Sequence, residues 1–142
     1  MGLTMVQVKL ANYVDLVNAE AGLMPRSAVR THEIQALADT GAIAMAIPED
    51  VVRALGVLVM GSERVRVADG RSITVPRAHG LGIEVLGRWV TGEALVLPEG
   101  ATPLLGVVQL ELMDLVVVPS TGEVIPNPAH PDGPVLPMLL AG

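Results

Sequence analysis

Residues 34–47 read Ile-Gln-Ala-Leu-Ala-Asp-Thr-Gly-Ala-Ile-Ala-Met-Ala-Ile, with one carboxylate between two apolar runs. Each run has the length and composition of a buried strand, so Asp39 is expected to stand in a tight turn between two strands. Because burial raises the free energy of a charged group, such an acid is either paired or functional. Thr40 adds a short hydroxyl, and Gly41 allows a close backbone approach. Asp-x-Gly is also common turn chemistry, so the tripeptide alone leaves both interpretations open.

Short apolar runs between glycines and prolines occur along the whole chain, and this pattern predicts many short strands. The predicted strands are 3–10, 13–18, 28–38, 43–47, 64–68, 72–76, 82–87, 89–97, 115–118 and 123–126. Asp69-Gly70 predicts a tight hairpin turn between two of them, because glycine tolerates positive φ.

Two segments are expected to be helical. In 48–55 a proline and two acids suit a first turn, and Gly56 can end the helix. The second segment is 107–114. The expected fold is therefore a single all-β domain with one or two short helices, spanning 1–126 and followed by a proline-rich tail, 127–142.

Composition excludes several classes of protein. The 142 residues fit one domain, and the absence of cysteine removes disulfides, thiol nucleophiles and zinc–thiolate sites. A net charge of -6 argues against a nucleic-acid partner. Aromatic residues make up 1%, so the core is expected to be aliphatic. No apolar run approaches the ~18 residues of a membrane helix and no signal peptide is evident, so the chain is expected to be cytoplasmic without a membrane partner.

Several common metal-binding, catalytic and phosphate-binding motifs are absent from the sequence, which narrows the possible functions. His32, His79 and His130 lack ligand spacing, so each is expected to be a surface or edge-strand residue, with no metal and no cofactor. The chain also lacks a Gly-x-Ser-x-Gly elbow and a glycine-rich phosphate loop.

The predicted elements and motifs around Asp39 follow one another in a definite order along the chain. They are an apolar strand, Asp39-Thr40-Gly41-Ala42, a second strand, helix 48–55, hairpin 64–76, then Leu104-Leu105-Gly106 and helix 107–114. This series, from about Gln35 to Val118, resembles the single-lobe, retropepsin-like aspartic peptidases of the bacterial type. The stretches 97–100 and 127–134 are similar to those of bacterial members.

The resemblance implies a retropepsin-like acid-protease barrel that acts as a two-fold homodimer and hydrolyses peptides or proteins. Asp39 would be the catalytic residue, with Thr40, Gly41 and Ala42 as its supporting loop. The flap over the substrate would be Ala68, Asp69, Gly70 and Arg71, and Leu104, Leu105 and Gly106 would lie behind the active site. Because the family's chemistry needs two carboxylates and the chain has one such motif, each copy would supply one Asp39.

Two departures from the family pattern leave an alternative open. Retroviral members have an acid after Asp-Thr-Gly-Ala that pairs with an arginine, whereas Ile43 and Val107-Val108 stand there in this chain. The flap tip, 68–71, is also not glycine-rich. The alternative is a catalytically inactive module that binds peptide or dimerises. A third hypothesis is self-processing, with 19–27 or the proline-rich tail in a neighbour's cleft.

Overall fold

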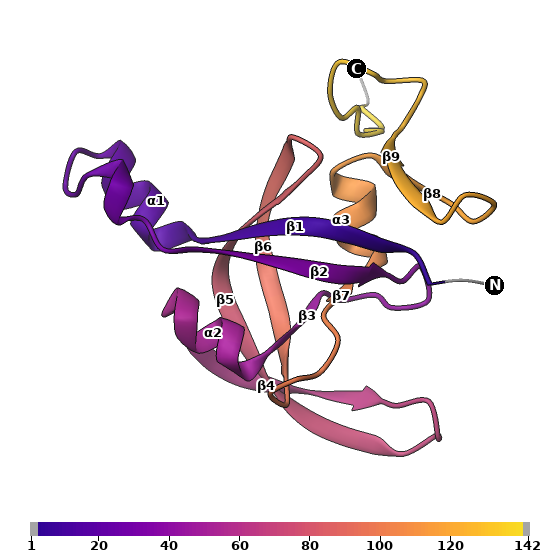
Figure 1. Ribbon diagram of the computed structural model, residues 1–142, viewed down its shortest axis with the longest axis horizontal. Coiled ribbons are helices and arrows are strands. Elements are labelled where there is room, and N and C mark those ends of the chain that lie inside the picture. Colours follow the sequence, from indigo (N-terminus) through magenta and orange to yellow (C-terminus); the bar gives the residue numbers. More distant parts are fainter. Residues whose placement is uncertain (1–2, 141–142) are drawn as a thin grey trace.

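The computed structural model describes residues 3–140, and strands dominate it (Figure 1). Within that range seven strands form one sheet in the spatial order β1-β2-β7-β3-β6-β5-β4. Strand β1 also pairs with β5, so the pairings of six strands close into a ring, with β4 outside it. The strands are β1 (Met5–Asn12), β2 (Thr31–Ala38), β3 (Ala46–Pro48), β4 (Val59–Arg66), β5 (Ser72–Val85), β6 (Arg88–Leu97) and β7 (Leu104–Leu105). A separate hairpin joins β8 (Leu115–Val118) and β9 (Glu123–Pro126).

The core is aliphatic, as the composition predicts. Buried and exposed side chains alternate along β1, because successive residues of a strand point to opposite faces. The largest fully buried side chains are those of Leu10, Met45, Ile47, Leu55, Leu81, Ile83, Leu105 and Met113. Because strands dominate residues 3–140, the prediction of an all-β fold class is confirmed.

Three α-helices decorate the strands within residues 3–140, one more than the sequence predicts. They are α1 (Tyr13–Glu20), α2 (Glu49–Leu55) and α3 (Val107–Leu112), with a short 3-10 turn at Arg26–Ala28. Helix α2 has the predicted acidic first turn and ends at Gly56, whose φ of 64° is left-handed. Helix α3 begins where expected and stops two residues earlier.

The predicted strand 13–18 is wrong, because this segment is helix α1. Its valines favour a strand locally, but Asn12 caps the helix by accepting a hydrogen bond from the Asp15 amide (3.0 Å). The Asn12 amide group also donates to Leu55 O (2.9 Å), which ties the cap to the end of α2. Capping and tertiary contact therefore override the local β preference.

Other boundaries shift by a few residues. The predicted strands 72–76 and 82–87 are one continuous strand, β5, with a register shift between Ala78 and Leu81. The turn between β4 and β5 is a five-residue loop, 67–71, rather than the predicted tight turn. The strand predicted at 43–47 is short, because only β3 forms ladder pairs in that region.

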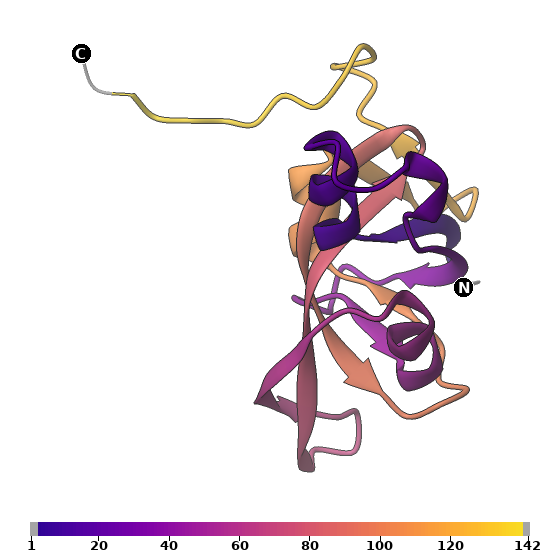
Figure 2. The ribbon, with the colours of Figure 1, turned by 90° about the vertical axis from the view of Figure 1, so that its left-hand side faces the viewer.

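Residues 127–140, after β9, contain no helix or strand. Figure 2 shows this segment leaving the body near the β8–β9 hairpin and running outward. Over residues 3–140 no helix has both the length and the apolar character needed to cross a membrane.

Candidate functional site

The Asp39 loop begins directly after β2 and is tied down by backbone hydrogen bonds. The Asp39 amide donates to Leu105 O (3.0 Å), and the preceding Ala38 amide donates to Thr4 O (2.8 Å). The loop also closes on itself, since the Ala42 amide donates to Asp39 O (3.1 Å) and the Gly41 amide to Asp39 Oδ1 (2.9 Å). The carboxylate is therefore oriented by its own turn, which is the local chemistry that Asp-x-Gly predicts.

The predicted motif at Leu104-Leu105-Gly106 lies directly behind this loop. Strand β7 runs between β2 and β3, pairing in parallel with Leu37 and Ala38 of β2 and antiparallel with β3. The chain thus passes between two strands that are joined by the Asp39 loop. This pairing brings together two segments that are separated by more than 60 residues in sequence.

At Gly106 the two segments approach too closely to leave room for a side chain. A Cβ added to Gly106 would lie 2.6 Å from Ile43 O and 2.6 Å from Ala44 O. Beyond it, the Val107 amide donates to Ala42 O (2.8 Å). Only glycine leaves room for this approach, so the backbone that follows β7 packs directly against the backbone of the Asp39 loop.

Ile43 and Val108, which stand where the resembled pattern has an ion pair, meet in this structure. The Val108 amide donates to Ile43 O at 3.4 Å, so the backbones at these positions are in contact. Both side chains are apolar and exposed, Ile43 by 74%. Met5 is exposed on the strand beside the loop, where it pairs with Leu37, and Leu3 is exposed just before that strand. The Asp39 end of the molecule therefore presents apolar side chains around a half-buried carboxylate.

The predicted flap residues lie at the turn of the β4–β5 hairpin. The Arg71 amide and guanidinium both donate to the Asp69 carboxylate, at 2.9 and 2.6 Å, and Gly70 has a φ of 88°. These bonds stay within the turn, so they shape its tip. In Figure 1 this turn and the loop that follows β2 project to the same side of the molecule.

Of the three histidines, His130 departs most from the prediction of an isolated surface residue. His130 Nδ1 lies 2.6 Å from Asp114 Oδ2, and His79 Nε2 lies 2.8 Å from Met60 O. No group of three or more His, Asp or Glu side chains in residues 3–140 is arranged to hold a metal ion.

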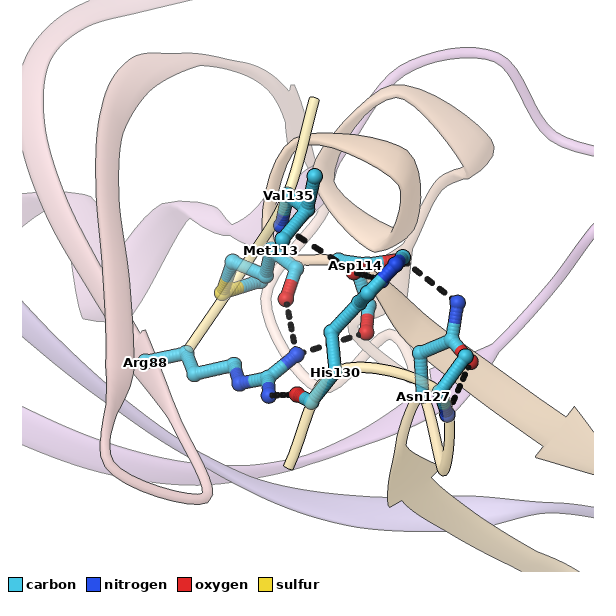
Figure 3. Close-up of polar contacts among 7 residues, drawn as sticks. Arg88, Met113, Asp114, Asn127, His130 and Val135 are labelled. Carbon is cyan, nitrogen blue, oxygen red and sulfur yellow. Dashed lines mark hydrogen bonds and ion pairs between the residues drawn. The ribbon is translucent and has the colours of Figure 1, made fainter. Parts of the chain in front are cut away.

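A polar cluster that no sequence pattern predicts binds the C-terminal segment to the rest of the protein (Figure 3). Asp114, the last residue of the predicted helix 107–114, lies just after α3 with a φ of 55°. It accepts hydrogen bonds from Asn127 Nδ2 (3.0 Å) and the Val135 amide (3.2 Å). The Arg88 guanidinium donates to Met113 O, Asp114 O and His130 O. We call Arg88, Asp114, Asn127 and His130 the tail clasp.

The tail clasp also changes the acidity of its carboxylate. The hydrogen bond from Asn127, then that from the Val135 amide, and lastly His130, lower the pKa of Asp114 from 3.8 to about 2. At neutral pH the clasp therefore contains a charged carboxylate that holds residues 127–135 against the body.

Neither a scan against models of known protein families nor a search of curated proteins found a match to this chain.

Proposed function

We propose that this chain is an aspartic endopeptidase that hydrolyses peptide bonds with a water molecule activated by two copies of Asp39. The observation behind this proposal is the crossing of β7 between β2 and β3, which supports the Asp39 loop from beneath. A carboxylate on such a braced loop keeps one geometry during a reaction, as proton transfer between fixed groups requires.

The proposed chemistry needs a second carboxylate about 3 Å away, and a homodimer supplies it. A two-fold axis beside the loop makes one motif serve twice, because a two-fold interface is self-complementary. The exposed apolar side chains of Leu3, Ile43 and Val108 suit such an interface, since dimer interfaces are more apolar than the rest of the surface. In the dimer the exposed Thr40 would face its own copy across the axis.

Two carboxylates at that distance cannot both ionise, so the pair holds a single proton. The ionised Asp39 takes a proton from the attacking water, while the protonated Asp39 donates to the carbonyl oxygen of the scissile bond. The product of this step is a tetrahedral diol, which collapses with protonation of the leaving amine. The β4–β5 hairpin would cover the bound peptide and exclude water.

The test is peptide cleavage by Asp39→Asn, with Asp132→Asn as its control, because Asp132 is an exposed acid of the C-terminal segment. Over pH 3–7 on a mixed peptide library, Asp39→Asn should lose cleavage by ~10³-fold or more, since proton transfer is removed from both copies. Asp132→Asn should cleave as the unmodified chain does. Cleavage that survives Asp39→Asn would refute the proposal. A wild-type chain that binds peptides without cleaving them at any pH would favour the inactive module instead.

A further inference from the structure

An open groove of about 730 Å³ lies between α1 and strands β1, β5 and β6. Its walls include the chain's only tyrosine and only tryptophan, Tyr13 and Trp89. Leu16, Val17 and Ile83 add apolar surface. Trp89 is 55% exposed and Val17 47%, so side chains that would normally be covered face solvent here.

The charges at the rim of this groove balance one another. Lys9 and Arg26 contribute two positive charges, and Glu20 and Glu84 contribute two negative ones. Arg26 and Glu20 already pair with each other at 3.1 Å. The groove therefore suits an uncharged, apolar occupant better than a charged one.

The groove is remote from the Asp39 loop. Thr31, the first residue of β2, lines it, whereas Asp39 follows the last residue of that strand. Eight steps along a strand of ~3.3 Å per residue separate Thr31 from Asp39 by roughly 26 Å. The groove is therefore not the substrate cleft of the proposed peptidase.

The C-terminal segment has the matching chemistry. Its exposed apolar side chains are Val135, Leu136, Met138, Leu139 and Leu140. Within the stretch 134–140, prolines stand at 134 and 137, three residues apart, which matches the three-residue period of a polyproline II helix. Segments of this kind dock in grooves lined by aromatic side chains, because their backbone is already extended and loses little entropy on binding. No residue from 134 to 140 is charged.

The direction of the segment favours a second copy as the partner. The tail clasp binds the segment at Val135. Figure 2 shows the end of the segment running away from its own domain. We propose that two copies of this chain exchange their C-terminal segments, with residues 134–140 of each seated in the α1 groove of the other.

The area involved agrees with a reciprocal exchange. Each leucine-sized side chain buries about 100 Å². One contact would therefore bury about 700–800 Å² in total. This area counts the side chains of Leu136, Met138, Leu139 and Leu140 and the groove surface that they cover. Two such contacts reach about 1,500 Å², the size of a stable protein interface, whereas a single contact does not.

Disulfide trapping between two differently marked chains tests the exchange, and the absence of native cysteine makes each introduced thiol unique. A Val17→Cys chain mixed with a Leu139→Cys chain should give a mixed disulfide on non-reducing gels. The control pairs Leu139→Cys with Val116→Cys, which is exposed on β8 away from the groove. A yield no greater than that of the control would overturn the proposal. So would a Val17→Cys/Leu139→Cys double variant that forms only intrachain disulfides at every protein concentration.

Trp89 provides a second readout that needs no added probe. Truncation after Val135 removes the apolar segment but keeps the hydrogen bonds of the tail clasp. The fluorescence emission of Trp89 in the full-length chain should move to shorter wavelength as the protein concentration rises, because the docked segment would cover the indole. The emission of the truncated chain should not move. Emission that does not depend on concentration in either chain would overturn the exchange. Asp39 takes no part in these measurements, so their failure would leave the peptidase proposal standing.

Discussion

Replacing Gly106 by alanine tests the energetic consequence of the close approach of β7 to the Asp39 loop. The added Cβ would lie 2.6 Å from two carbonyl oxygens and 2.7 Å from the Ala44 carbonyl carbon. These distances are about 0.8 Å shorter than the 3.4 Å at which ordinary contact begins. All three atoms belong to backbone, so no flexible side chain can turn away and relieve the overlap.

The expected cost follows from this overlap alone. Gly106 has a φ of −85° and a ψ of 175°, which any residue adopts, so alanine adds no backbone strain. Overpacking of a well-packed site costs about 1–3 kcal/mol, and the rigid backbone on both sides places Gly106→Ala at about 3 kcal/mol. With a urea m value of ~2 kcal/mol/M, the unfolding midpoint should fall by ~1.5 M.

The matched control is Gly92→Ala in β6. A Cβ at Gly92 would meet its nearest atom, Ile83 Cδ1, at 3.6 Å, which is ordinary contact. The urea midpoint of Gly92→Ala should stay within ~0.3 M of that of the unmodified chain, because the substitution should change the free energy of unfolding by less than ~0.5 kcal/mol. If Gly106→Ala unfolds at the same urea concentration as Gly92→Ala, the close approach of β7 to the loop is refuted.

Two further changes probe the tail clasp and the contact between α1 and α2. Because the folded pKa of Asp114 is about 2 against 3.8 unfolded, its stabilising effect is complete above pH ~5 and is lost as the pH falls from ~4 to ~2. Asparagine tolerates the left-handed backbone, so Asp114→Asn should lower the Tm at pH 7 through the lost charge alone. The Tm values of the variant and of the unmodified chain should become equal near pH 2. A difference in Tm that is the same at all pH values would contradict this. Gly56→Ala should cost about 1–2 kcal/mol in urea unfolding, because the left-handed φ disfavours a side chain and the new Cβ would displace Arg30, which pairs with Asp15. An unchanged midpoint would contradict the contact between Gly56 and Arg30.

What could be predicted from the sequence is mostly what local pattern determines. The turn at Asp39 and the helix capped by Gly56 follow from residues that are neighbours in the chain. The place of Leu104-Leu105-Gly106 behind the loop is a long-range contact, and it could be predicted because the order of the motifs resembles a known arrangement. Composition alone predicts the aliphatic core.

The missed features all depend on contacts between distant residues. The cap of α1 is visible locally as Asn12 followed by Asp15, yet the valines between and after them suggest a strand, and the bond from Asn12 to Leu55 is tertiary. The tail clasp joins Arg88 to His130, 42 positions away, through a backbone carbonyl that has no sequence signature. The groove likewise exists only because α1 folds over β5 and leaves Trp89 half covered.

Two surfaces with exposed apolar side chains lie near opposite ends of strand β2. One surrounds Asp39 and presents Ile43 and Val108, and the other is the groove that contains Trp89. Each proposal joins two copies through one of these surfaces, and each contact is reciprocal. Two reciprocal contacts coexist in a dimer only if they share one two-fold axis; otherwise the chain assembles beyond the dimer. Because the groove lies roughly 26 Å from the loop that would stand on the axis, only a segment that reaches out from its own domain could satisfy both contacts within one pair.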